Sequence, residues 1–166
     1  MASTYEKIAT TTLGSAAADV TFSSISGAYT DLVLICSILG TSGVTSNVVT
    51  RVNGDTGSNY SSTYLYGTGS TAASGRQTNS THIFIAQLNG YAVTNQPMPI
   101  IVNFQNYSNT NTYKTILSRG NSAGTDVMTD VGLWRSTSAI NSITVKFDVG
   151  NLQSGSTATL YGILKA

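Results

Sequence analysis

Hydrophobic and polar residues alternate over short stretches of this chain, and one stretch is apolar almost throughout. That stretch is Asp31 to Leu39, which reads DLVLICSIL. Val33, Ile35 and Ile38 are β-branched residues, which pack well on a pleated surface. The run is too short to cross a membrane, because a spanning helix needs about 20 apolar residues. The pattern therefore predicts a central β-strand that is buried on both faces.

The rest of the chain reads as short strands separated by clusters of Gly, Ser and Asn. Tyr5 to Thr12 is rich in Thr and is interpreted as either a first strand or an arm. Asn53-Gly54-Asp55 is a strong turn signal. Together with the central run, alternation predicts about nine strands: Asp19 to Ser24, Asp31 to Leu39, Asn47 to Asn53, Thr81 to Leu88, Ile100 to Tyr107, Tyr113 to Ser118, Val127 to Ser136, Ser142 to Val149 and Thr157 to Leu164.

The segment from Thr56 to Thr78 is the least regular part of the sequence. It carries three tyrosines between runs of Ser, Thr and Gly. Loops longer than about 15 residues inside a compact domain are usually functional or contain further structure. We expect a binding loop here, with a short strand or helical turn around Ser62 to Tyr66.

Strand spacing and length together predict the fold class. No stretch predicts a helix of about ten residues or more, and turns separate strands at intervals of roughly 8 to 14 residues. A chain of 166 residues fits one domain. We therefore expect an all-β protein in which residues 1–166 form a single antiparallel β-sandwich of the jelly-roll type.

Composition excludes several classes of partner. Charged residues make up 9% of the chain and the net charge is +1, whereas 40% of residues are hydrophobic, which argues against disorder. The eight basic residues are scattered, so we expect no binding to nucleic acid or to an anionic membrane.

Cys36 is the only cysteine and lies in the most apolar run, so an inert buried thiol is expected. The first residues show no secretory signal.

Candidate catalytic residues are few. His82 is the only histidine and lies in a predicted strand, where a hydrogen-bonded structural role is expected. Zinc needs about four Cys or His ligands, and only two such residues are present. The seven carboxylates form no calcium-loop motif, although a glycosidase pair assembled from distant residues stays open. We expect no enzyme activity and no cofactor.

Tyrosines supply the candidate contact residues. Two interpretations stay open: the side chains form a partner surface, or they close the ends of the sandwich. The N-terminal residues Ala2 to Lys7 are an alternative contact arm. The candidate partner contacts are Tyr60, Tyr64, Tyr66, Tyr107 and Tyr113, which lie in the irregular segment and around the polar tip NYSNTN.

Several blocks in a fixed order resemble a family of small tailed-phage virion structural proteins. The blocks are YEKIATTTLGS, VTFSSISGAYTDLVL, NGDTGSNYSSTYLYGTGS, GLWRSTSAINSITV and the ending STATLYGI. The resemblance runs nearly end to end. It implies a jelly-roll module of phage heads or tails without catalytic residues.

The resemblance leads to specific expectations about function. We expect a capsid decoration, or cement, protein on the virion head, because no fibre-type attachment domain or coiled-coil heptad is visible. Its partners would be the major capsid protein or other virion proteins, and a homotrimer at a lattice axis is the simplest assembly. The alternative is a tail-tip or fibre module that binds host-surface glycans. A glycan-cleaving enzyme is a third reading.

Overall fold

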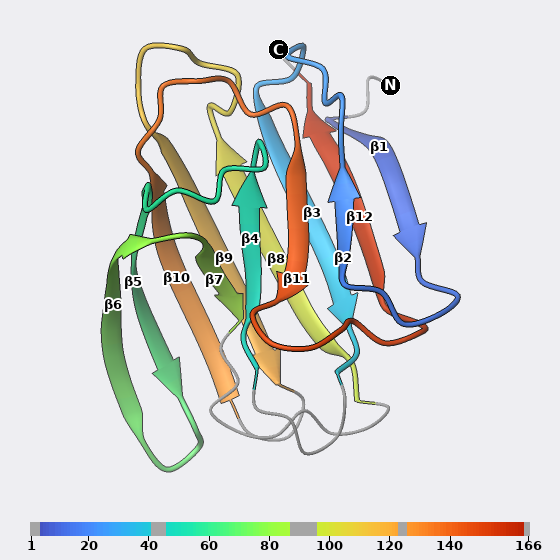
Figure 1. Cartoon of the computed structure of the whole chain (residues 1–166), viewed down its shortest axis with the longest axis vertical. Helices are drawn as coiled ribbons and strands as arrows, with labels where there is room; N and C mark the ends of the chain where they lie inside the picture. Colours follow the sequence, from blue (N-terminus) through green and yellow to red (C-terminus); the bar gives the residue numbers. More distant parts are fainter. Residues whose placement is uncertain (1–3, 41–45, 87–95, 123–125, 165–166) are drawn as a thin grey trace.

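Two antiparallel β-sheets packed face to face make up the protein (Figure 1). The computed structural model describes residues 4–40, 46–86, 96–122 and 126–164. The large sheet has the order β1 (Tyr5–Thr12), β12 (Thr157–Ile163), β3 (Asp31–Ile38), β8 (Met98–Gln105), β9 (Lys114–Ser122), β10 (Asp126–Trp134), β5 (Tyr60–Gly67) and β6 (Ala72–Ser80). The small sheet has the order β2 (Asp19–Phe22), β11 (Ile143–Phe147), β4 (Val48–Val52) and β7 (Ile83–Ala86).

The strand order is that of a jelly roll. The quartet β1-β12-β3-β8 in one sheet faces the quartet β2-β11-β4-β7 in the other, and the chain crosses between the sheets as it passes from β1 through β4. This winding is the double Greek key of jelly rolls. The predicted all-β, jelly-roll sandwich is therefore confirmed. Two additional hairpins, β5–β6 and β9–β10, extend the large sheet beyond β8.

The hydrophobic core lies between the two sheets. On β3, Leu32, Leu34, Cys36 and Ile38 point inward and are buried. The opposite face of the same strand is only partly covered, because Ile35 is 44% exposed. The prediction that this strand is buried on both faces therefore holds at Val33, which is buried on the outer face, and is wrong at Ile35. No second layer among the described residues covers that side of the sheet.

The turn after β4 forms where the sequence predicts it. Asn53 and Gly54 both have positive φ values, 53° and 64°, and the Asp55 N–H donates to the Val52 carbonyl at 3.0 Å. Two positive φ values suit Asn-Gly, because Gly has no Cβ to clash and Asn tolerates the left-handed region. The turn does not make a hairpin here, since it sends the chain from the small sheet to the large one.

The irregular segment forms the hairpin β5–β6. The short strand expected around Ser62 to Tyr66, as one of two alternatives, is part of β5, whereas a long loop is not what forms here. Tyr60, Ser62, Tyr64 and Tyr66 alternate inward along β5, so this strand follows the predicted period of two. β6 has no large apolar residue, because an edge strand that overhangs the small sheet has little to bury. Figure 1 shows both strands at the side of the molecule, beyond β7.

The N-terminal segment belongs to the large sheet. Tyr5 to Lys7 pair with β12, and a register shift separates Lys7 from Ala9. The alternative of a free contact arm is therefore wrong for these residues, while Ala2 lies outside the described residues. Helices are absent from the described ranges, so no described helix could cross a membrane.

Candidate functional site

An exposed aliphatic surface covers one side of the large sheet. We define the outer face as the side chains of β3, β8, β9, β10, β5 and β6 that point away from the small sheet. Side chains of successive residues alternate between the two faces of a strand, so every second residue of each strand belongs to the outer face. Five large aliphatic residues lie there with substantial exposure: Ile35 44%, Leu65 57%, Leu117 37%, Val127 61% and Val131 50%.

Strand register brings these residues together. Leu117 on β9 is the direct partner of Val131 on β10, which in turn is opposite Thr63 on β5. Such cross-strand neighbours have Cβ atoms about 5 Å apart. Leu65 lies opposite Thr129 in the next row, and Ile35 pairs with Ile101 at the other side of the face. Residues from distant parts of the sequence therefore form one apolar surface.

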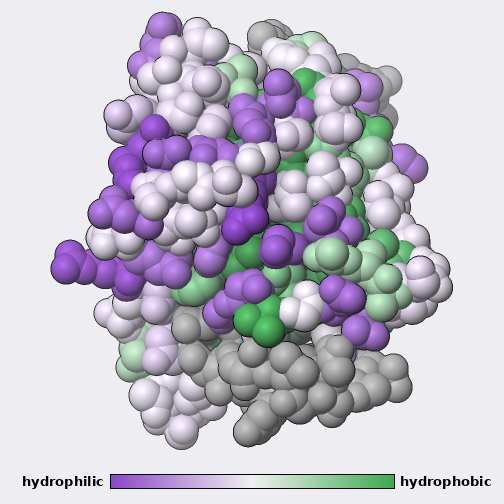
Figure 2. Space-filling view, viewed as in Figure 1, coloured by the Kyte–Doolittle hydropathy of each residue, from purple (hydrophilic) through white to green (hydrophobic). Residues whose placement is uncertain are grey.

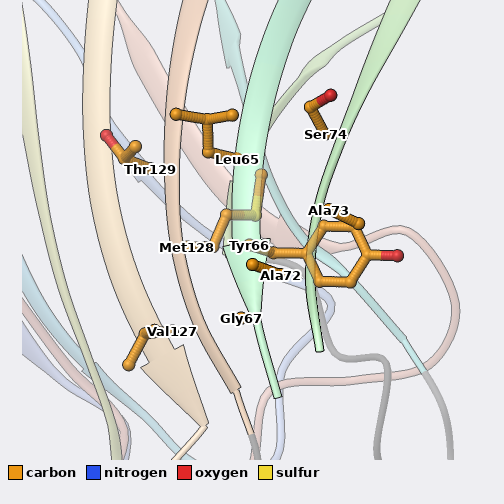
Figure 3. Close-up of a pocket in the computed structure, with 9 residues that line it drawn as sticks. All are labelled: Leu65, Tyr66, Gly67, Ala72, Ala73, Ser74, Val127, Met128 and Thr129. Atoms are coloured by element: carbon orange, nitrogen blue, oxygen red, sulfur yellow. The ribbon is translucent and has the colours of Figure 1, made fainter. Parts of the chain in front are cut away.

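A shallow groove of about 680 Å³ lies at one end of the outer face (Figure 3). Leu65, Val127 and Thr129 project to the same side of the strands, whereas the Tyr66 ring projects to the other side. Gly67 helps to form the floor, because it places no side chain between Leu65 and Val127. Aliphatic walls and a flat floor suit a protruding apolar side chain of a partner.

The outer side of the small sheet is polar by contrast. Thr21 on β2 donates a hydrogen bond to Asp19, and its hydroxyl lies 2.8 Å from the hydroxyl of Thr144 on β11. Lys146 lies on the same side of β11. Figure 2, which shows this side of the molecule, has hydrophilic side chains gathered on the left and both hydrophilic and hydrophobic side chains in the middle, where the small sheet lies. The two outer sides thus differ in chemistry.

The structure corrects two of the five tyrosine predictions. Tyr60 is buried, and its hydroxyl donates to the carbonyls of Val52 and Asp55. Tyr107 is also buried, and its hydroxyl donates to the Ser26 carbonyl and accepts from the Tyr29 N–H. Both side chains close the core, so neither is available to a partner of the folded chain.

Tyr64, Tyr66 and Tyr113 remain partly or largely exposed. The Tyr64 ring packs edge-on against Phe84, with 6.0 Å between centroids, and lies beside Tyr66 at the edge of β7. Tyr113 precedes β9 at the other end of the sheet, since its neighbour Lys114 pairs with Trp134. The structure therefore does not gather the predicted tyrosines into one surface.

A buried acid is the main feature that sequence reasoning missed. Asp130 points inward from β10 and is fully buried, and neither carboxyl oxygen has a hydrogen-bond partner. The hydroxyls of Ser62 and Ser118 on the adjacent strands are likewise buried and unpaired. Burial raises the pKa of Asp130 to about 7, and the smaller effect of the Ser62 hydroxyl is to lower it. Alternation in DVMTDVGLW carries the signal, because it places Asp130 on the same face as Trp134.

The candidate catalytic groups His82 and Asp148 have contacts within the fold. His82 lies beside Thr81 and Phe84, and burial lowers its pKa. Asp148 accepts hydrogen bonds from Ser46 and Asn47 in the loops that flank β4 and β11. Among the described residues, no group of three or more His, Cys, Asp or Glu side chains could hold a metal ion.

Comparison with known protein families and with curated proteins finds no match for this chain. Among solved structures, alginate lyase Aly36B is 10% identical, covers 95% of this chain and 81% of its own, and has a TM-score of 0.39. A double mutant of that enzyme in complex with alginate tetrasaccharide is 11% identical over the same shares, with a TM-score of 0.31. Likeness at this level carries no argument about function, and the jelly-roll assignment rests on the strand order.

Proposed function

We propose that this protein is a structural component of a tailed-phage virion that docks onto another virion protein, as a decoration protein of the head. The observation that supports the proposal is the exposed aliphatic outer face of the large sheet. Single exposed apolar residues are normal on any protein, but contiguous apolar patches mark interaction sites. The resemblance to small virion proteins supports the same class of function.

The size of the outer face suits a stable contact. Six neighbouring strands of eight or nine residues, spaced about 4.8 Å apart with a rise of about 3.3 Å per residue, span roughly 25 by 28 Å. The resulting area of about 700 Å² is close to the roughly 800 Å² that each partner buries in a standard protein–protein interface. One such contact is sufficient for specific docking.

Copy number in purified virions tests the head assignment. A decoration protein repeats over the capsid lattice, so quantitative mass spectrometry should count hundreds of copies per particle. About a dozen copies would instead place the protein in the tail, where symmetry axes are few, and would support a glycan-binding tip.

The docking face is tested by substitutions on both sides of the molecule. Val131→Asp and Val127→Asp should abolish binding of the purified protein to particles that lack it, because a carboxylate would be buried in an apolar contact. Val149→Asp is the matched control, since Val149 is 63% exposed but lies in the turn after β11. If all three variants lose binding equally, or if none of them loses binding, the outer face is not the contact.

Assembly as a homotrimer at a lattice axis remains part of the proposal, because a symmetric oligomer multiplies one contact into several. Light scattering on the particle-free protein and on protein released from virions should both report three copies. A monomer in both samples contradicts the trimer but leaves the docking face intact.

A further inference from the structure

Among the described residues, two arginines are the only charged side chains on the outer face between β8 and β6. Arg119 projects from β9 and Arg76 from β6, and both are exposed. Every carboxylate of β10 points to the inner face, and β8, β9, β5 and β6 contain no Asp or Glu. The part of the outer face between β8 and β6 therefore carries positive charge without an acid of its own, and the acid of the outer face, Asp31, lies at the start of β3 and accepts a hydrogen bond from the Asn106 N–H.

Register places Arg119 in the middle of the outer face, where Ile101 on β8 is its other neighbour, and Arg76 at the β6 edge. Arg119 is opposite Thr129, which is opposite Leu65, while Arg76 is opposite Thr63 in the next row. Three strand spacings and one row separate the two Cα atoms, or about 16 Å. Leu65, Thr129 and Val131 lie between them.

We propose that the outer face binds an acidic, apolar protein surface, with carboxylates of the partner paired to Arg119 and Arg76 and apolar contacts between them. This inference rests on the proposed docking function and names the chemistry of its partner. Arginine suits such a contact, because its planar guanidinium binds a carboxylate through two parallel hydrogen bonds.

A second copy of this chain fits the same face poorly. Two outer faces packed against each other would bring four arginines into a desolvated contact without a carboxylate from β8, β9, β10, β5 or β6. Unpaired charges in a buried contact are strongly unfavourable. The outer face is therefore not self-complementary.

A glycan also fits less well than a protein. Leu65 and Val131 lie between the arginines, and burying their side chains against sugar hydroxyls would remove water without supplying apolar contact. Pairing of Leu65, Val127 and Val131 with apolar side chains of a protein gains that free energy.

Charge reversal tests the inference on particles of the encoding phage grown without this gene. Arg119→Glu and Arg76→Glu should each raise the Kd by roughly tenfold or more, because like charges would then meet in the contact. Arg119→Lys keeps the charge but loses the paired hydrogen bonds, so it should weaken binding less than Arg119→Glu does. Lys146→Glu on the outer side of the small sheet is the matched control and should bind as the wild type does. Thermal melting of each variant verifies that it is folded.

Two treatments of the contact test the nature of the partner. Conversion of particle carboxylates to neutral amides with carbodiimide and ethanolamine should weaken wild-type binding as strongly as the arginine reversals do. Raising the salt concentration from about 0.05 to 0.5 M should weaken the wild type several-fold but the Arg76→Glu/Arg119→Glu double variant far less, because salt screens the attraction.

The outcomes separate the inference from the proposed function. If the wild type does not bind the particles at all, the docking function itself fails. If the wild type binds but the reversals and amidated particles bind equally well, the acidic partner is wrong and docking stands. Loss of binding after periodate oxidation of particle sugars, with amidation harmless, would show a glycan. Self-association that the reversals abolish would show a second copy. Either result overturns the inference.

Discussion

Tyr60 stacks on Trp134 across the paired strands β5 and β10, with 6.5 Å between ring centroids and 23° between ring planes. Both residues also reach Asp55 in the turn after β4: the Tyr60 hydroxyl donates to its carbonyl at 3.1 Å, and the Trp134 indole N–H donates to its carboxylate at 2.7 Å. The pair thus ties the large sheet to a turn that leaves the small sheet.

Replacement of Tyr60 tests this role. Tyr60→Ser should lower the free energy of unfolding by about 3–5 kcal/mol, because it removes a fully buried ring and leaves a cavity. Urea denaturation followed by Trp134 fluorescence measures the change. Tyr113→Ser is the control and should stay within about 0.5 kcal/mol of the wild type, since the Tyr113 side chain is 53% exposed. A Tyr60→Ser protein of normal stability that no longer binds particles would restore Tyr60 as a contact residue.

Asp130 should make stability depend on pH. Its pKa is about 7 in the folded protein and near the ordinary value of 3.8 in the unfolded chain. The folded state therefore holds this proton more tightly, so the contribution of Asp130 to stability is greatest below about pH 4 and falls as the pH rises towards 7. Each unit of pKa difference corresponds to about 1.4 kcal/mol.

Asp130→Asn isolates that effect. The amide has nearly the same shape and does not ionise, so the variant should lose the decrease between about pH 4 and 7 and should exceed the wild type in stability at pH 8. Urea unfolding at several pH values measures both profiles. Parallel profiles for the two proteins would show that Asp130 ionises freely in the folded state.

Two other carboxylates, Asp55 and Asp148, change the stability in the opposite direction to Asp130, and they do so at lower pH. Burial alone would raise the pKa of Asp55, but hydrogen bonds from Trp134, Asn59 and Gly57 lower it overall. Burial would also raise the pKa of Asp148, but hydrogen bonds from Ser46 and Asn47 lower it overall. Their contribution is present above pH 4 and is lost as the pH falls further. His82 also titrates between pH 4 and 7: burial lowers its pKa from 6.5, so its effect on stability rises with pH in this window. The difference between the wild type and Asp130→Asn therefore isolates Asp130.

Gly132 should be indispensable for the spacing of the sheets. A Cβ atom at this position would lie 2.6 Å from side-chain carbons of Ile83 on β7, well inside van der Waals contact. Gly132→Ala should therefore destabilise the protein by about 1–3 kcal/mol in thermal or urea unfolding. Gly14→Ala is the control, because nothing lies within 4 Å of a Cβ there. Recovery of stability by adding Ile83→Val would confirm the contact, and a fully stable Gly132→Ala would refute it.

The Cys36 thiol should not react with disulfide reagents in the folded protein. Its side chain is 2% exposed, and burial raises the pKa of the thiol to about 12. Thiolates rather than thiols react with disulfide reagents, so an aromatic disulfide at pH 8 should modify Cys36 only after urea unfolds the chain. Rapid stoichiometric reaction without urea would mean that β3 opens readily.

Local patterns predict much of this fold. Alternation and β-branched residues identify nine of the strands, including the apolar run that becomes β3, and Asn53-Gly54 predicts a turn that the structure confirms. These features depend on neighbouring residues alone: the two-residue period of a strand and the tolerance of Asn and Gly for positive φ. The hairpin β5–β6 is harder to predict, because β6 has no apolar alternation.

Tertiary structure decided which faces are covered. Tyr60 and Tyr113 look alike in sequence, yet one is enclosed by the opposite sheet and the other is exposed. Val131 and Asp130 are adjacent in β10 and point to opposite faces of the large sheet. Val131 faces solvent, whereas Asp130 faces the small sheet and is buried. A period of two determines which residues share a face, but only the pairing of distant strands, and the layer laid over them, determines which face is buried.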